Sequence, residues 1–309
     1  MFETLEIGLG LQIVEWFQSW GQGFIWYLLA PLHYLGEETG YLLLLPVLYW
    51  SVHKESGEKL LILVLSTAFI GTIFKNWWQR PRPFQVAPDR ITSIYQTETF
   101  GLPSGHTMFG TVLGIGVIKE AKKRWVTIAM LVFIVLMGIS RMIHGVHYLQ
   151  DVIAGLLLGT AYVSLFYLMY DQISVSLARY SMGQKFLFII LGLALVFILV
   201  TLIHHEHETR KSFLSLSGAL AGGLTGLILE HEFLNFKIKN AVCMRIASSV
   251  VGLVTLLAVY FLLNIGFYSI VGKSTTIPAL ILYVIRYGLV GFWITFCVPW
   301  LLKKIKLLN

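Results

Sequence analysis

Long apolar segments recur along the whole chain, separated by short polar ones. The longest cover residues 60–74, 125–141, 152–170, 186–203, 213–229, 246–267 and 277–302, and shorter ones cover 24–35, 41–52 and 107–118. Several approach the ~20 residues that an α-helix needs to cross the hydrocarbon core of a bilayer. The pattern predicts an all-α polytopic membrane protein. We expect eight to ten spans, the range reflecting the short length of the first two segments.

The first 22 residues have a different pattern. Leu5, Leu9 and Ile13 recur at helical spacing, whereas Glu6 and Glu15 interrupt the apolar face. An apolar stripe beside a polar one is typical of a helix that lies in the membrane interface. We therefore expect an interfacial amphipathic helix at residues 1–22, not a full span.

Composition supports a membrane protein and indicates its orientation. Only 13% of the residues are charged, about half the ~25% of soluble domains. The net charge of +7 is concentrated in loops, so it does not indicate a nucleic-acid partner. The loop at residues 119–124 has four cations against one acid, and three lysines lie between 303 and 306. The positive-inside rule then predicts that both termini are cytoplasmic. We expect the chain to lie in the plasma (inner) membrane.

The longest polar stretch, residues 75–105, contains four of the eight prolines. It and the next loop carry three polar clusters: Lys75 to Pro83, Pro103 to His106, and Ser140 to Asp151. All three fall at span ends predicted to be extracytoplasmic. Ionisable groups at membrane depth are costly and are usually paired or functional.

The cations in these clusters suit a phosphate group. The guanidinium groups of Arg82 and Arg141 can each bind two oxygens of one phosphate, and Lys75 adds a point charge. Ser104 can cap the helix that follows, and Gly105 allows close approach to its free N–H groups. Together these residues predict a pocket for one phosphoryl group. The alternative is that the cations contact lipid headgroups at the interface.

The histidines supply candidate chemistry. Asp151 follows His147 by four residues, so the two share a face at a helix start. The carboxylate can hold one imidazole nitrogen while the other attacks phosphorus. His106 can then act as the general acid on the leaving oxygen, a role typically contributing ~10²–10⁴ in rate.

These clusters resemble the three-part signature of the type-2 phosphatidic acid phosphatase (lipid phosphate phosphatase) superfamily. The matching residues are Lys75, Arg82-Pro83, Pro103-Ser104-Gly105-His106, Ser140-Arg141, His147 and Asp151. The resemblance implies a six-helix catalytic core, placed at residues 23–172, and three to four additional transmembrane helices of unassigned role at 173–309. It also implies metal-independent hydrolysis, without a cofactor, through a phosphohistidine on His147. The layout is similar to bacterial members with extra C-terminal helices.

Several other polar residues fit other roles better. Arg80 duplicates the Arg-Pro pattern and is a possible extra phosphate contact or a headgroup partner. His144 is expected to be packed or interfacial. Glu98 and the run 204–208, which alternates His and Glu, are expected to be solvated loop residues although the run invites a metal interpretation. Gly218, Gly222 and Gly226 recur at a spacing that predicts close helix packing.

The functional hypothesis is hydrolysis of a lipid phosphate or diphosphate that enters from the bilayer. Phosphatidic acid, phosphatidylglycerophosphate, polyprenyl diphosphate and sphingoid-base phosphate all fit. A lipid phosphotransferase using the same phosphohistidine is the first alternative, and a phosphatase of a soluble sugar phosphate is the second. An anion transporter is a third, against which the complete set of His106, His147 and Asp151 argues.

Overall fold

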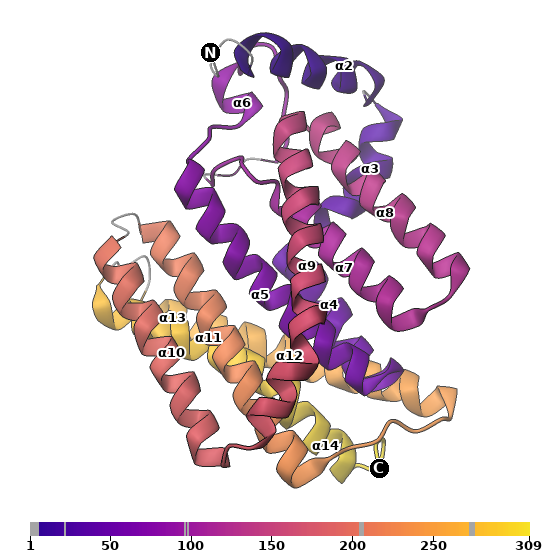
Figure 1. Cartoon of the computed structure of the whole chain (residues 1–309), viewed down its shortest axis with the longest axis vertical. Helices are drawn as coiled ribbons and strands as arrows, with labels where there is room; N and C mark the ends of the chain where they lie inside the picture. The colour runs from indigo at the N-terminus through magenta and orange to yellow at the C-terminus, as the bar shows by residue number, and fades with distance from the viewer. Residues whose placement is uncertain (1–5, 22, 96, 98, 204–206, 272–275) are drawn as a thin grey trace. The chain divides into compact units, whose positions relative to one another are not determined.

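The computed structural model describes residues 6–21, 23–95, 97, 99–203, 207–271 and 276–309, and the described chain is helical (Figure 1). Its α-helices are α2 Leu11–Gly21, α3 Phe24–Leu35, α4 Glu38–Val47, α5 Lys54–Trp78, α6 Pro83–Val86, α7 Gly105–Ala121, α8 Arg124–Ile143, α9 Leu149–Ala178, α10 Met182–Ile203, α11 His207–Leu229, α12 Val242–Val271, α13 Ile277–Phe292 and α14 Val298–Lys304. Four π-helical turns adjoin them: η1 Glu6–Gly10, η2 Leu48–Val52, η3 Glu230–Leu234 and η4 Trp293–Cys297. The predicted all-α class is confirmed.

Seven of the described helical segments are long and apolar enough to cross a membrane. They contain α5, α8, α9, α10, α11, α12 and α13, the last continuing through η4 into α14. The other three predicted spans correspond to shorter helices. α3 has 12 residues, α4 has 10 and α7 has 17, all below the ~20 that a straight crossing needs. The protein is a multi-pass membrane protein, and the expected eight to ten spans include these short helices beside the seven long ones.

The chain divides into two compact units that are not continuous in sequence. The first contains Met1–Leu42 and Ile70–Leu168, and the second contains Leu43–Phe69 and Met169–Asn309. Helix α5 contributes to both. The predicted functional boundaries at residues 22 and 172 stay predictions, because compactness alone does not test them.

Glycines let the helices of the first unit approach closely. A Cβ added to Gly155 of α9 would lie 2.7 Å from the carbonyl oxygen of Ser104, and one added to Gly159 would lie 3.0 Å from that of Met108. Helix α7 also packs on α8, which contacts α2 and α3. This packing fixes the N-terminal end of α7 beside the first turn of α9, where two of the three polar clusters meet.

Helix α2 is anchored to the first unit. Its Leu11 and Val14 form a buried cluster with Ile91 and Tyr148. The side-chain amide of Gln18 donates to the carbonyl oxygen of Thr92 at 2.6 Å. The segment is therefore helical from Glu6 to Gly21, as expected, and one face of it is packed on protein. Its position in the membrane interface stays a prediction, and residues 1–5 and 22 lie outside the described residues.

The second unit is built around the close contact of α11 with α13. A Cβ on Gly222 of α11 would overlap the backbone of Gly288 in α13, and one on Gly218 would overlap that of Val284. The predicted close packing at these glycines is confirmed. A buried ion pair also lies in this unit, with Lys54 Nζ 2.7 Å from Glu230 Oε1.

Candidate active site

The short segment before α9 positions the proposed nucleophile beside its carboxylate. His147 precedes α9, and Asp151 lies in the first turn of that helix. Nδ1 of His147 is 3.3 Å from Oδ2 of Asp151, which also accepts the backbone N–H of Tyr148 at 3.0 Å. Both side chains are buried, with 1% and 0% exposed. The predicted sharing of one helix face thus appears as a direct contact.

Arg82 determines which nitrogen of His147 carries the proton. Its Nη1 lies 3.1 Å from Nε2 of His147. A guanidinium only donates hydrogen bonds, so Nε2 must be the accepting nitrogen and Nδ1 must carry the hydrogen. That hydrogen points to Asp151. The result is a neutral imidazole whose lone pair is on the nitrogen farther from the carboxylate, which is the form a nucleophile requires.

Electrostatics also favour the neutral form of this imidazole. Burial, together with the positive charge of Arg82, holds the pKa of His147 well below its ordinary value of 6.5. Lys75, His106 and Arg141 act on it in the same direction. The imidazole therefore stays unprotonated in mildly acidic conditions.

Arg82 is fixed by a dense set of acceptors. Its guanidinium donates to the carbonyl oxygens of Thr99, Phe100 and Val146 and to the hydroxyl of Thr99, at 2.7 to 3.2 Å. Only 4% of the residue is exposed. Fixed donors of this kind are effective at stabilising charge, because they do not have to reorganise during the reaction.

The N-terminus of α7 forms the facing wall. Ser104 is the N-cap residue, and its hydroxyl accepts the backbone N–H of Thr107. The N–H of Ser104 donates to the carbonyl oxygen of Asp151 at 2.9 Å, which ties this turn to α9. A Cβ on Gly105 would lie 3.6 Å from Nζ of Lys75. The predicted capping by Ser104 is confirmed, and Lys75 lies over the helix N-terminus.

Arg141 is held by two histidines, one of them unforeseen. Its Nη1 is 3.0 Å from Nδ1 of His33 in α3, and its Nη2 is 3.2 Å from Nδ1 of His144. Burial and the Arg141 charge lower the pKa of His144 to about 4, so this imidazole is a neutral acceptor. His144 is packed as expected, but its contact makes it a support for Arg141. His33 carried no sequence signal, because it belongs to none of the three clusters.

Arg80 contacts the carboxylate of Asp151. Its Nη1 lies 3.1 Å from Oδ1 of Asp151, and its guanidinium lies over the ring of Tyr148 at 4.6 Å. Its likeness to the Arg-Pro pattern predicted an extra phosphate contact or a headgroup partner. In the structure it instead pairs with the group that orients His147.

His106, the proposed acid, faces a carboxylate that belongs to none of the three polar clusters. Nε2 of His106 is 3.1 Å from the carbonyl oxygen of His33 and 3.5 Å from Oε1 of Glu37. His33, Glu37 and His106 have donor atoms within 4.8 Å of one another, a grouping that could hold a metal ion. Of the residues considered earlier for other roles, Glu98 and residues 204–206 lie outside the described residues, and the side chains of 207 and 208 are not described either.

Two family models, several curated relatives and solved structures match parts of this chain. Residues 58–174 match the model of the PAP2 superfamily, and residues 214–309 match that of the PAP2 superfamily phosphatase transmembrane extension. Sphingosine-1-phosphate phosphatase 1 of Mus musculus is 27% identical over 319 residues, covering 89% of this chain and 73% of the relative. A probable sphingosine-1-phosphate phosphatase of Dictyostelium discoideum is 32% identical over 162 residues, covering 47% of this chain and 38% of the relative. A solved PAP2-type phosphatidylglycerolphosphate phosphatase from Bacillus subtilis has a TM-score of 0.46 at 23% identity, covering 54% of this chain and 87% of that one.

Proposed function

The chain belongs to the PAP2 superfamily and is a membrane phosphatase, and from this premise we propose that it cleaves a lipid phosphate or diphosphate through a phosphohistidine on His147. The observation that carries the proposal is the line of contacts from Asp151 through His147 to Arg82. Asp151 holds the Nδ1 hydrogen, and Arg82 donates to Nε2. Attack by a neutral, oriented imidazole beside fixed cations is the chemistry that this arrangement supports.

The reaction proceeds in two displacements. In the first, the Nε2 lone pair forms a bond to phosphorus while the bond from phosphorus to the lipid oxygen breaks. His106, protonated on both ring nitrogens before this step, gives one proton to that oxygen and becomes neutral, and the lipid alcohol leaves. In the second, water attacks the phosphohistidine, its proton returns to His106, and phosphate departs from a regenerated imidazole. Lys75, Arg82, Arg141, Ser104 and the Gly105 amide bind the phosphoryl oxygens throughout, so no step requires a metal ion.

The pocket is proposed to open on the extracytoplasmic side of the plasma (inner) membrane. Four cations against one acid between residues 119 and 124 support a cytoplasmic position for the loop after α7. The pocket residues lie at the opposite ends of α7 and α8, which follows from their positions at the start of α7 and the end of α8. With the pocket on that side, α2 lies there too, because Leu11 and Val14 pack on Ile91 and Tyr148 and Gln18 donates to the carbonyl oxygen of Ile143 at the end of α8. The N-terminal helix is then extracytoplasmic, contrary to the expectation from loop charge, whereas the three lysines between 303 and 306 support a cytoplasmic C-terminus.

The test is release of phosphate from defined lipid phosphates in detergent micelles with a chelator present. Wild-type protein is expected to release phosphate, and His147→Asn to lose activity by about 10⁴-fold or more. His53→Gln, an exposed histidine in the second unit, is the matched control and keeps wild-type activity. A labelled phosphoryl group that stays on the protein in alkali and leaves in acid identifies the phosphohistidine.

Two results would overturn the proposal. Full activity of His147→Asn would exclude this nucleophile. Transfer of the label to a second lipid in place of water would identify the protein as a phosphotransferase.

A further inference from the structure

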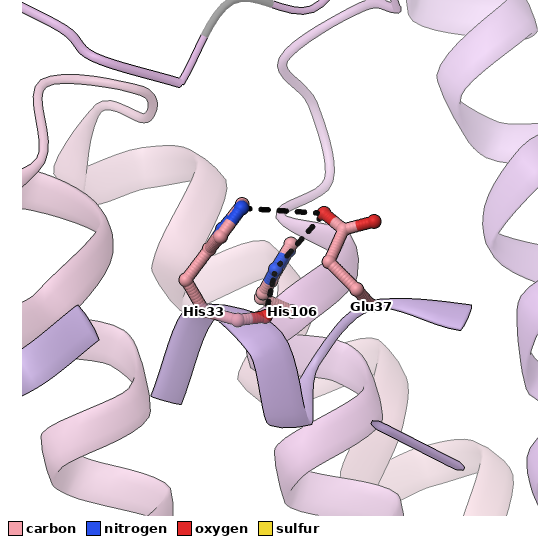
Figure 2. A group of neighbouring side chains, drawn as sticks. All are labelled: His33, Glu37 and His106. Atoms are coloured by element: carbon pink, nitrogen blue, oxygen red, sulfur yellow. Dashed lines mark hydrogen bonds and ion pairs between the residues drawn. The ribbon is translucent and has the colours of Figure 1, made fainter. Parts of the chain in front are cut away.

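A carboxylate lies at the edge of the cationic phosphate pocket. Glu37 follows α3 by two residues, and its side chain points toward His33 and His106 (Figure 2). Its Oε1 lies 3.8 Å from Nε2 of His33 and 3.5 Å from Nε2 of His106. It is 47% exposed, whereas Asp151 is fully buried and already pairs with Arg80 and His147. Glu37 is thus an accessible acid beside the proposed general acid.

The local backbone brings this acid to His106. The residue before it is Gly36, and a Cβ there would overlap the His106 ring. Any other residue at this position would push the turn and the ring apart. The His33 ring is held by Nη1 of Arg141 and stacks on Tyr95 with ring centroids 3.6 Å apart. The turn carrying Glu37 is therefore seated against the site by contacts on both sides.

The hydrogen bonds also fix the protons of the two imidazoles. Arg141 only donates, so Nδ1 of His33 accepts and Nε2 of His33 carries the hydrogen. The carbonyl oxygen of His33 only accepts, so Nε2 of His106 carries the hydrogen. A metal ion needs a lone pair on the nitrogen that it binds, and these two nitrogens present N–H groups to Glu37. The arrangement favours a ligand that interacts with the carboxylate alone.

A negative charge in this place works against the binding of phosphate. Glu37 lies within electrostatic range of Lys75, Arg82 and Arg141, the cations assigned to the phosphoryl group. It therefore offsets part of their charge and repels an incoming anion. A substrate that brings its own positive charge reverses this effect.

The position of Glu37 indicates where that positive charge would lie. His106 protonates the ester oxygen that leaves, and Glu37 is 3.5 Å from Nε2 of His106. An amine on the carbon adjacent to the ester carbon is three bonds of about 1.5 Å from that oxygen, hence roughly 3–4 Å away. An ammonium in that position lies beside the carboxylate when the ester oxygen lies beside His106.

We infer that Glu37 is a specificity-determining residue that binds a substrate ammonium group adjacent to the phosphate ester, as in sphingoid-base phosphates. This inference rests on the proposed function, since it takes His106 as the group next to the leaving oxygen. It selects one class among the lipid phosphates that fit the pocket. Lipid phosphates without the amine meet an uncompensated carboxylate and react more slowly.

The experiment compares two substrates that differ at this nitrogen: sphinganine 1-phosphate, which carries an ammonium group, and its N-acetyl derivative, whose amide is neutral and larger by an acetyl group. Wild-type protein is expected to have a kcat/KM about tenfold or more higher for the free amine, because a hydrogen bond to a charged group strengthens binding by at least that factor. Glu37→Gln removes the preference, because kcat/KM falls for the amine and rises for the N-acetyl derivative, which no longer meets a carboxylate. Asp89→Asn, an exposed acid in the same unit, is the charge-matched control and retains the preference.

Three outcomes would overturn the inference. One is equal kcat/KM for both substrates in the wild type. Another is an equal loss on both substrates in Glu37→Gln with a displaced pH profile, which would assign Glu37 to the proton of His106. The third is a loss of inhibition by added Zn²⁺ in Glu37→Gln without any change in amine preference, which would assign the cluster to a metal.

A binding measurement separates this inference from the proposed function. Non-hydrolysable phosphonate analogues of the same two lipids are titrated against purified protein in micelles. Tighter binding of the amine analogue to wild type, lost in Glu37→Gln, supports the role of Glu37 even if no phosphate is released. Hydrolysis of both lipids without any amine preference in binding or rate refutes the role of Glu37 and leaves the phosphatase intact.

Discussion

Replacement of Arg80 by leucine tests how the proposed nucleophile is oriented. The substitution keeps an apolar side chain against Tyr148 and removes the cation from Oδ1 of Asp151, 3.1 Å away. The Asp151 carboxylate is 0% exposed, so water does not replace the lost partner without rearrangement. Two consequences are expected, one for stability and one for turnover.

The magnitude follows from the remaining contacts of Asp151. Removal of one partner from a buried ion pair usually costs 3–5 kcal/mol, because the other charge is left uncompensated (about 3 kcal/mol is expected here). The lower end applies because Oδ2 still accepts from Tyr148 N and faces Nδ1 of His147. Turnover is expected to fall by about 10–100-fold, the range for loss of a group that orients a reactive one.

The assay combines thermal unfolding in detergent with steady-state kinetics and inhibition by inorganic phosphate. Arg80→Leu is expected to lower the unfolding temperature and kcat while leaving the inhibition constant for phosphate within about twofold of wild type. Arg90→Leu is the control, because its pair with Glu15 is exposed and such pairs contribute little. In an Asp151→Asn background the effect of Arg80→Leu should shrink, with a coupling of about 0.5–3 kcal/mol.

One result would refute this reasoning. If Arg80→Leu kept wild-type stability and kcat but bound phosphate tenfold more weakly, Arg80 would be a phosphate contact, as its sequence position first suggested. The same result would require Arg80 to leave Asp151 when substrate binds.

Three further predictions concern other parts of the molecule. Because burial holds the pKa of His147 below 6.5, we expect kcat/KM to fall at acidic pH only below pH 6.5. A pH–rate profile in which kcat/KM already falls above pH 6.5 would contradict this. As the pH falls, His147 is protonated in the unfolded state at a higher pH than in the folded state. The free energy of unfolding should therefore decrease as the pH falls below about 6.5, which thermal melts at several pH values can measure. Gly155→Ala places a Cβ 2.7 Å from the Ser104 carbonyl oxygen and should lower kcat/KM. Gly183→Ala is the control, because its Cβ has no neighbour within 4 Å. Equal kinetics of the two variants would show that α7 can shift freely. Lys54→Met removes the lysine that pairs with the buried carboxylate of Glu230, so the free energy of unfolding should fall by about 3 kcal/mol. An unchanged melting curve would show that the pair contributes nothing to stability.

The helical class and most of the residues around the pocket follow from local patterns. Apolar segments of span length predict the long helices, because an α-helix satisfies its own backbone groups in lipid. Ser104 ahead of Gly105 predicts a helix N-cap, and His147 four residues before Asp151 predicts their contact. In each case the residues that determine the local structure are close in sequence, so the pattern can be recognised without knowledge of the fold.

The contacts that the sequence did not reveal join distant segments. His33 and Arg141 are separated by 108 positions, and nothing in the apolar segment around His33 marks it as a partner of a guanidinium. Glu37 lies outside the three polar clusters, and nothing in the sequence around it marks it as a neighbour of His106, 69 positions away. Arg80 was assigned by its likeness to the neighbouring Arg-Pro pair, whereas in the fold it contacts Asp151 and Arg82 contacts His147.

The hydrogen bond from Arg82 to Nε2 of His147 has a consequence for the resting protein. The lone pair that would attack phosphorus is already engaged by a guanidinium 3.1 Å away. Phosphate oxygens are stronger acceptors for that guanidinium than a neutral imidazole, because the hydrogen bond is then assisted by charge on both sides. A phosphoryl oxygen that accepts this one hydrogen of Nη1 frees the Nε2 lone pair, while the bonds to Thr99, Phe100 and Val146 keep the guanidinium in place. Without substrate, Nε2 of His147 is a hydrogen-bond acceptor of Arg82, and the phosphoryl group of the substrate itself makes that nitrogen available for attack.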